Sequence, residues 1–193
     1  MVSPARHLFV DTRRYSRLPL HAGRRLQRGH RCIAASLAAV AALLAGGLID
    51  PQPRLVWNVS DSAPRGLYWV SRPSRPGIGE FAAARLSPDV EQLAAQRHYL
   101  PQGIPLIKKV AAVQGDEICA SGERVAVFGT LVATRREVDP AGFSLPWWNG
   151  CRRLGAGELL LINSANPLSF DGRYFGPTDS SRVIGRASLL WRL

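Results

Sequence analysis

An uninterrupted apolar run near the N-terminus constrains this chain more than any other feature. Residues Cys32 to Ile49 read CIAASLAAVAALLAGGLI, which is 18 positions without a charged side chain. As a helix this run is about 27 Å long, close to the thickness of the hydrocarbon core of a bilayer. Because the run has no polar face, it is unlike a helix on the surface of a soluble protein. The sequence therefore predicts a transmembrane anchor over residues 32–50.

The residues that precede this run set the expected orientation of the anchor. Eight arginines against one aspartate give residues 1–31 a net charge of +7, out of +11 for the whole chain. An arginine-rich flank of this kind stays in the cytoplasm. We therefore expect a basic cytoplasmic tail over residues 1–31 and a domain on the other side of the membrane over residues 51–193. A cleaved signal peptide is the alternative, although its apolar region is usually shorter.

The same charge distribution argues against a nucleic-acid partner, and the histidine and cysteine content argues against a metal site. A nucleic-acid-binding domain needs basic residues spread over a folded surface, whereas most of the charge here lies in the tail, so no nucleic acid is predicted. His98 is the only histidine after the apolar run, and no CxxC motif occurs, so the sequence predicts no metal and no cofactor.

Two cysteines lie beyond the predicted anchor. In an oxidising compartment Cys119 and Cys151 can form a disulfide, which is the simpler interpretation. A reactive Cys151 beside Arg152 and Arg153 is the alternative.

The pattern after the anchor is that of a mostly β domain. Short β-rich segments alternate with turns rich in Gly and Pro, which indicates short antiparallel strands. One short helix is predicted to begin at Ser87 and Pro88 and to end near His98. Strands are predicted at Leu67–Ser71, Pro105–Val113, Glu117–Ala120, Arg124–Phe128, Leu131–Val138, Gly157–Asn163 and Arg182–Trp191.

An apolar loop, Gly142 to Gly150, carries the sequence Leu-Pro-Trp-Trp in its middle. It suits either insertion into the membrane surface or packing as a turn against the domain core. The sequence leaves both alternatives open.

Lysine usage is the most informative chemical feature. Lys108 and Lys109 are the only two lysines, and every other long basic side chain is arginine. Arginine keeps its proton in proteins, whereas a desolvated lysine can lose it and act as a general base. Neighbouring residues of a strand point to opposite faces, so one lysine of the pair can be buried while the other is solvated.

A neutral lysine needs a hydroxyl to activate, and two serines follow the anchor closely. Ser60 and Ser62 lie within the turn-forming segment Asn58 to Gly66. Turn formation alone would account for such residues. A Ser-His-Asp arrangement is disfavoured, because His98 is the only histidine beyond the anchor.

Three segments together resemble the type I signal peptidases, and more closely their conjugative-transfer branch of TraF-type peptidases. NVSDSAPRGLYWV, Asn58 to Val70, resembles the box that carries the nucleophile. YLPQGIPLIKKVAAVQGDEIC, Tyr99 to Cys119, resembles the lysine box. NPLSFDGRYFGPTDSSRVIGRA, Asn166 to Ala187, resembles the last box. The boxes occur in family order behind an N-terminal anchor, and the resemblance spans residues 33–193.

The resemblance implies a role for individual residues of these boxes. Ser62 falls on the nucleophile, although its Ser-x-Pro spacing is shorter than the Ser-x-x-Pro of general signal peptidases and leaves Ser60 as the other candidate. Lys108 falls on the general base. Ser60 also falls on a hydroxyl of the oxyanion hole, and Ser169 on a hydroxyl that orients the lysine. Asp171 and Arg173 fall on an acid–base pair, for which a structural salt bridge and a catalytic role are both open.

What the resemblance implies overall is a membrane-anchored serine endopeptidase with a signal-peptidase-like β domain. It would sit in a bacterial inner membrane with its catalytic domain in the periplasm. Its expected partners are the lipid bilayer, a precursor protein or pilin as substrate, and components of a conjugation or type IV secretion apparatus. A general signal peptidase is one alternative function, and a non-catalytic membrane-tethered scaffold of a secretion complex is another.

Overall fold

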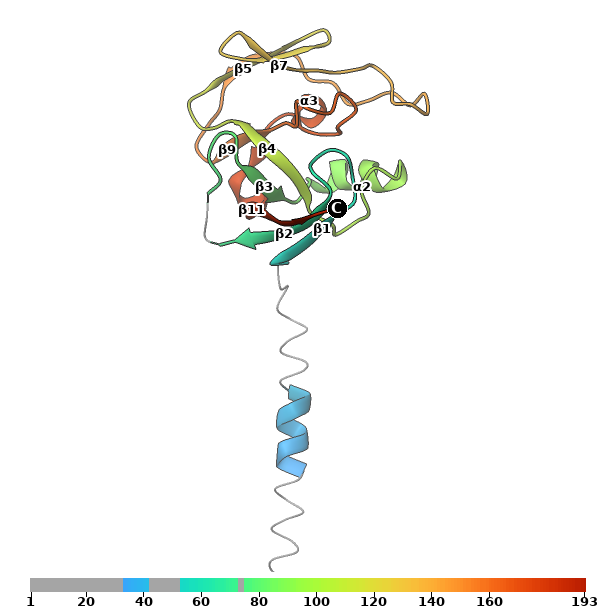
Figure 1. Ribbon diagram of the computed structural model, residues 1–193, viewed down its shortest axis with the longest axis vertical. Helices are drawn as coiled ribbons and strands as arrows, with labels where there is room; N and C mark the ends of the chain where they lie inside the picture. The colour runs from blue at the N-terminus through green and yellow to red at the C-terminus, as the bar shows by residue number, and fades with distance from the viewer. Residues whose placement is uncertain (1–32, 42–52, 73–74) are drawn as a thin grey trace, which may run out of the picture. The chain divides into compact units, whose positions relative to one another are not determined.

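A computed structural model describes residues 33–41, 53–72 and 75–193 of the chain (Figure 1). Residues from Gln52 to Leu193 form one compact unit. Its strands are β1 Leu55–Asn58, β2 Gly66–Ser71, β3 Phe81–Ala84, β4 Leu106–Ala112, β5 Glu117–Ser121, β6 Arg124–Val127, β7 Thr130–Thr134, β8 Gly150–Arg153, β9 Glu158–Leu161, β10 Thr178–Asp179 and β11 Val183–Arg192.

These strands form two antiparallel sheets. The larger has the order β1-β2-β11-β3-β4-β9-β10, and the smaller has the order β7-β6-β5-β8. In Figure 1, β5 and β7 lie at the opposite end of the unit from β1 and β2. Ile118 and Val125 of the small sheet pack with Leu160 and Ile162, so a shared apolar core connects the two sheets. For the described residues, the predicted mostly β domain of short antiparallel strands is confirmed.

Strand β11 inserts between β2 and β3 and completes the large sheet. Two glycines make this insertion possible. A Cβ on Gly66, at φ +147°, would lie 2.0 Å from the carbonyl oxygen of Trp191, and a Cβ on Gly185 would lie 2.1 Å from that of Ser71. No side chain fits at such distances, so only glycine lets β11 approach β2 this closely.

The helices are short. Helix α2 spans Pro88–Gln96, with Ser87 as its N-cap and proline in its first turn, so the predicted start is confirmed. Helix α3 is a single turn, Gly172–Phe175, and η2 is a 3₁₀ turn at Ser180–Arg182. A proline at the first helical position loses no hydrogen bond, because that N–H has no partner within the helix.

Several strand assignments made from the sequence were incomplete. Strands β1, β3, β8 and β10 were not predicted, and the strand expected over Leu131–Val138 ends at Thr134. β3 reads FAAA, and alanine has little intrinsic preference for strands. It is a strand because β11 and β4 pair with it on both sides, burying all three alanines.

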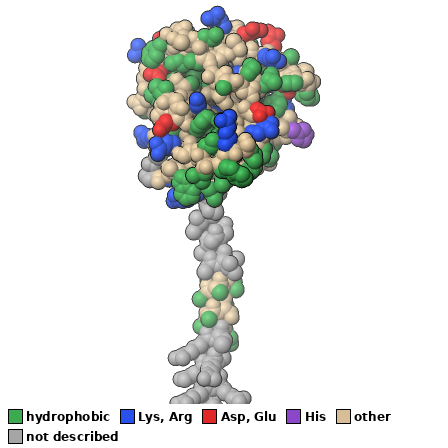
Figure 2. Space-filling view, in the orientation of Figure 1, with side chains coloured by type: hydrophobic (Ala, Val, Ile, Leu, Met, Phe, Trp, Pro, Cys, Tyr) green, Lys and Arg blue, Asp and Glu red, His purple; other side chains and the backbone are tan. Residues whose placement is uncertain are grey.

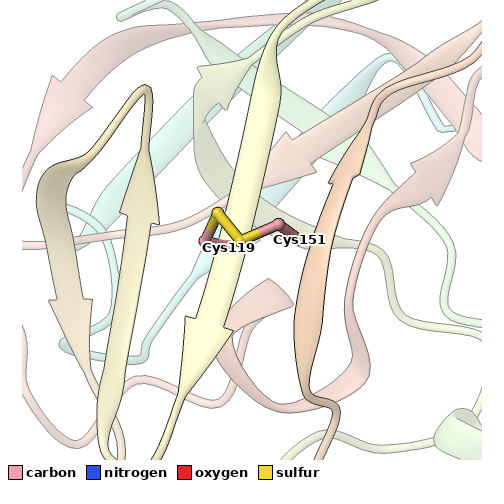
Figure 3. Close-up of a disulfide and its surroundings, with 2 residues drawn as sticks. All are labelled: Cys119 and Cys151. Carbon is pink, nitrogen blue, oxygen red and sulfur yellow. A yellow bond between two sulfur atoms is a disulfide. The ribbon is translucent and has the colours of Figure 1, made fainter.

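A disulfide joins Cys119 of β5 to Cys151 of β8 (Figure 3). The two cysteines are directly opposite each other in the antiparallel register. All four residues of β8 are exposed, so this edge strand buries no side chain of its own. The covalent bond therefore adds to the backbone hydrogen bonds that hold β8 on the sheet.

The predicted tail over residues 1–31 lies outside the described residues, as does most of the predicted anchor over residues 32–50. Residues 33–41 are helical and exposed. Within the part of the chain that is described, no helix is both long enough and apolar enough to cross a membrane.

Candidate active site

The two predicted serines lie in the turn between β1 and β2. Their hydroxyls are in contact, with 2.8 Å between the Oγ atoms of Ser60 and Ser62. Both residues are half-buried. We call residues 59–65 the serine turn.

Two side chains that were not singled out in the sequence hold the serine turn in place. The Nδ2 amide of Asn58 lies 3.0 Å from the carbonyl oxygens of Ser60 and Ala63 and 3.1 Å from that of Pro64. The hydroxyl of Tyr68, a fully buried residue of β2, donates to the Pro64 carbonyl at 2.8 Å. An asparagine at the head of a Ser/Asp/Pro cluster is typical of a side chain that closes a local turn, and this signal could have identified Asn58.

Lys108 lies in the middle of β4 and points into the protein. It is 3% exposed, and its Nζ donates to the Ser169 hydroxyl at 2.9 Å. Lys109 points the other way, is exposed, and has its Nζ 5.5 Å from the centroid of the Phe81 ring. The predicted alternation of a buried and a solvated lysine is therefore confirmed.

Burial of Lys108 favours its neutral form. Removing the ammonium from water lowers the pKa of Lys108 from 10.5 to about 8. The negative charge of Asp171 raises this pKa and the positive charge of Arg173 lowers it, so these two effects oppose each other. A lysine with a pKa near 8 holds a useful neutral fraction close to neutrality.

Asp171 and Arg173 form a buried ion pair, with 2.8 Å between Arg173 Nε and Asp171 Oδ1. Asp171 also accepts from the backbone N–H groups of Asn163 and Arg173. Arg173 donates to the carbonyl oxygens of Thr134, Asn163 and Pro167. These bonds tie three backbone segments together, so the geometry favours the structural alternative for this pair. Its influence on Lys108 is electrostatic.

Four of the predicted site residues line one cleft of about 490 Å³: Ser60, Ser62, Lys108 and Ser169. Asp171 and Arg173 do not line it. The walls are mainly apolar, with side chains that include Val56, Val59, Leu86, Ile104, Ile107, Val138, Leu145, Leu168 and Phe170. An apolar cleft with a few convergent polar groups is the usual form of a binding or active site.

One wall of the cleft is a loop that follows β7 and includes Val138, Asp139 and Leu145. The hydroxyl of Tyr99 donates to the carboxylate of Asp139. Arg97, at the end of α2, donates to the Ser144 carbonyl at 2.7 Å. These bonds fasten the loop to the segment that follows α2.

The tryptophans next to this loop pack on the domain. Trp147 and Trp148 are half-buried, and Trp148 Nε1 donates to the Gly172 carbonyl at 3.1 Å. The guanidinium carbon of Arg135 lies 3.8 Å from the centroid of the Trp147 ring. Of the two alternatives for the segment Gly142 to Gly150, these contacts favour the packed turn.

The described residues contain no group of three or more His, Cys, Asp or Glu side chains placed to hold a metal ion. Among the groups that line the cleft are the hydroxyl pair of Ser60 and Ser62, the buried amine of Lys108 and the hydroxyl of Ser169. A hydroxyl and an amine of lowered pKa are the components of amine-assisted nucleophilic catalysis.

Comparison with known proteins gives a consistent family match. The model of the family described as signal peptidase, peptidase S26, matches residues 28–192. The resemblance to signal peptidases that the three boxes indicated is confirmed by this match.

Three relatives are transfer proteins named TraF. Two proteins from Escherichia coli called plasmid transfer protein TraF are 32% and 34% identical, covering 82% and 80% of this chain and 91% and 93% of their own length. A conjugal transfer protein TraF from Agrobacterium fabrum is 32% identical, over 67% of this chain and 78% of its own. A crystal structure of a signal peptidase I from Enterococcus faecalis V583 is 15% identical, has a TM-score of 0.35, and covers 60% of this chain and 98% of its own.

Proposed function

The chain belongs to the signal peptidase S26 family, and from that premise we propose that it is a membrane-anchored serine endopeptidase that cleaves exported precursor proteins. One observation carries the proposal. A buried lysine, with its pKa lowered to about 8, lines the same cleft as a pair of serine hydroxyls.

In the proposed reaction, neutral Lys108 accepts the hydroxyl proton of Ser62 as Ser62 Oγ attacks the peptide carbonyl carbon. The tetrahedral oxyanion accepts hydrogen bonds from the Ser62 N–H and the Ser60 hydroxyl. The C–N bond then breaks, and the Lys108 ammonium returns the proton to the leaving amine. Water, or an amine, then attacks the acyl ester and releases Ser62. The hydroxyl of Ser169, 2.9 Å from Lys108 Nζ, orients the amine.

The proposal predicts a pH profile with a definite sign. Because only neutral Lys108 can accept a proton, kcat/KM should rise about tenfold per pH unit below the lysine pKa and level off above it. With that pKa at about 8, the rise should fall between pH 6 and 8. Initial rates on a precursor peptide from pH 6 to 9.5 measure the profile, and a flat profile would count against a lysine base.

Trapping the acyl-enzyme tests which serine reacts. Quenching a cleavage reaction in acid and digesting the protein should give one peptide whose mass is increased by the acyl group, with the modification on Ser62. The Ser62→Ala variant should give no acylated peptide, whereas Ser60→Ala should still be acylated at Ser62. An acyl group on Ser60 would mean that Ser60 is the nucleophile and that Ser62 supplies the other hydroxyl. If neither serine carries an acyl group, the non-catalytic scaffold is favoured.

The location and substrate class are also part of the proposal. The apolar run to Ile49 ends six positions before β1, and the end of the unit that carries β1, β2 and β11 is rich in exposed apolar side chains (Figure 2). They include Leu55, Trp57, Trp69, Leu190 and Trp191. Trp57 and Trp191 lie edge to face, 6.1 Å between ring centroids. Aromatic side chains of this kind favour a membrane interface, which supports an active domain held at the periplasmic surface.

The relatives named as plasmid and conjugal transfer proteins support a pilin or another precursor of a conjugation or type IV secretion apparatus as substrate. Mass spectrometry of a candidate pilin from cells with and without this protein tests this assignment. A protein that instead restores growth to cells depleted of their general signal peptidase would have the broader function.

A further inference from the structure

We propose that Arg136 is a specificity-determining residue, whose guanidinium binds a carboxylate of the substrate peptide several residues away from the bond that is cut. This inference rests on the proposed serine-peptidase function. Its basis is the set of charged side chains that line the cleft and the partners that each of them has.

The two carboxylates that line the cleft both have partners within the protein. Asp61 pairs with Arg65, with 2.7 Å between Oδ1 and Nε. Asp139 accepts from the hydroxyl of Tyr99 and from two backbone N–H groups of its own loop. Neither carboxylate therefore pairs with a cationic side chain that lines the cleft.

The cleft is also lined by two cationic residues, Lys108 and Arg136, which differ in their contacts. Lys108 is buried, and its Nζ donates to Ser169 at 2.9 Å. Arg136 is exposed, and among the described residues no hydrogen bond or ion pair reaches its guanidinium. A guanidinium carries five N–H donors, arranged so that two of them can bind one carboxylate in parallel. The cleft therefore presents an unpaired group that is suited to binding a carboxylate.

The backbone of Arg136 is already fixed at the cleft wall. Its N–H donates to the hydroxyl of Tyr174 at 3.2 Å, and Tyr174, 3% exposed, lines the same cleft. The preceding residue, Arg135, is buried, with its guanidinium carbon 3.8 Å from the centroid of the Trp147 ring. The two neighbouring arginines therefore differ in role. Only the side chain of Arg136 has to be ordered when a substrate binds, which keeps the entropic cost of the contact small.

Contacts along the cleft separate Arg136 from the reacting groups. Ser169, which accepts from Lys108, is followed by Phe170, and the Phe170 ring stacks on Tyr174 with 5.9 Å between centroids. The hydroxyl of Tyr174 in turn accepts from the backbone of Arg136. Two aromatic rings therefore lie along the path from the lysine to the arginine. Because an extended peptide advances about 3.3 Å per residue, we expect the carboxylate several positions from the scissile bond.

A set of substrate peptides tests for this carboxylate. The starting peptide spans the cleavage site of a precursor that the protein cuts, with its acidic residues replaced by their amides and its C-terminus amidated. Glutamate and glutamine are then compared at each position along the peptide. Glutamate at one position should raise kcat/KM about tenfold over glutamine, the scale of a hydrogen bond to a charged group.

The carboxylate can belong to an acidic side chain or to the C-terminal end of the substrate, and shortened peptides distinguish these sources. Peptides that end at successive positions after the scissile bond are compared with a free carboxylate and with an amide at the end. A higher kcat/KM for one free end would assign the contact to the chain end, and a preference for glutamate would assign it to a side chain. If neither change raises kcat/KM by more than about twofold, the proposal is overturned.

Variants of Arg136 show whether this residue makes the contact. Arg136→Gln should reduce the preference for a carboxylate to about twofold or less. Arg136→Glu should reverse it, so that lysine at the same position is cleaved faster than glutamate. Both variants should fold, because the side chain is exposed and the bond to Tyr174 comes from the backbone. A merely structural role would slow the cleavage of all peptides alike, and a preference that Arg136→Gln leaves unchanged would overturn the proposal.

Arg124→Glu is the matched control. Arg124 is exposed on β6 and lies outside the cleft, and its replacement changes the net charge by the same amount as Arg136→Glu. It should leave the preference for a carboxylate intact, whereas an equal reversal would reveal a long-range effect of net charge and overturn the proposal. Ser62→Ala is measured alongside. If it cleaves as well as the unmodified protein, the proposed function itself fails, whereas Ser62-dependent cleavage without a carboxylate preference defeats only the role of Arg136.

Discussion

Replacing Lys108 with alanine or arginine is expected to lower kcat/KM for precursor cleavage by at least about 10⁴-fold, the scale seen when a member of a nucleophile–base pair is removed. Alanine removes the base that accepts the Ser62 proton. Arginine keeps the bulk and charge, but it does not lose its proton near neutrality. Both variants should therefore fail equally. The measurement is cleavage of a precursor peptide by the purified protein in detergent.

Lys109→Arg is the control for this prediction. Lys109 is adjacent in sequence but exposed on the opposite face of β4. Its replacement should leave kcat/KM within about twofold, as is usual for a solvated side chain away from a site. Full activity in a folded Lys108→Ala protein would remove the lysine from the mechanism, and with it the proposed function in its present form.

The second large effect concerns stability. Asp171→Ala should lower the free energy of unfolding by about 3–5 kcal/mol, since it leaves the guanidinium of Arg173 buried without a counter-charge. The pair is 1% and 0% exposed, so water cannot replace the lost carboxylate without opening the fold. The backbone N–H groups of Asn163 and Arg173 also lose their acceptor. Urea unfolding under conditions that keep the disulfide oxidised measures the change.

Arg186→Ala is the matched comparison for the buried pair. Arg186 pairs with Glu80 at 3.1 Å, but both side chains are more than 40% exposed. An exposed ion pair contributes little, so the urea midpoint should stay close to that of the unmodified protein. Similar midpoints for Asp171→Ala and Arg186→Ala would contradict the structural role assigned to Asp171.

The sequence predicted those parts of the site that depend on local pattern. Lys108 and Lys109 had to face opposite ways once residues 105–113 were assigned to a strand, so that one of them could be buried. The start of α2 followed from a serine–proline pair. The position of Ser60 and Ser62 in a turn followed from the cluster of turn formers around them.

Features that depend on distant contacts were not predictable in the same way. The strand expected over Leu131–Val138 stops at Thr134, which pairs with Arg124, the first residue of β6, so that there is no partner strand beyond it. The next residue, Arg135, is buried and donates to the carbonyl oxygens of Gly122 and Trp148. An arginine in a sequence reads as a solvated residue, and only the fold shows the acceptors around it. The role of Asp171 could not be predicted for the same reason. One of its partners is the backbone N–H of Asn163, and because every residue except proline has such an N–H, the sequence gives no sign of this bond.

Strand order has a consequence for when the candidate active site can form. The serine turn joins β1 to β2, and Lys108 belongs to β4, yet in the large sheet β11 lies between β2 and β3. Ten residues that leave the ribosome after every other strand described here must therefore be in place before nucleophile and base can meet. Under the proposed function, a chain whose last strand has not yet entered the sheet would therefore hold Ser62 and Lys108 apart and would cleave nothing.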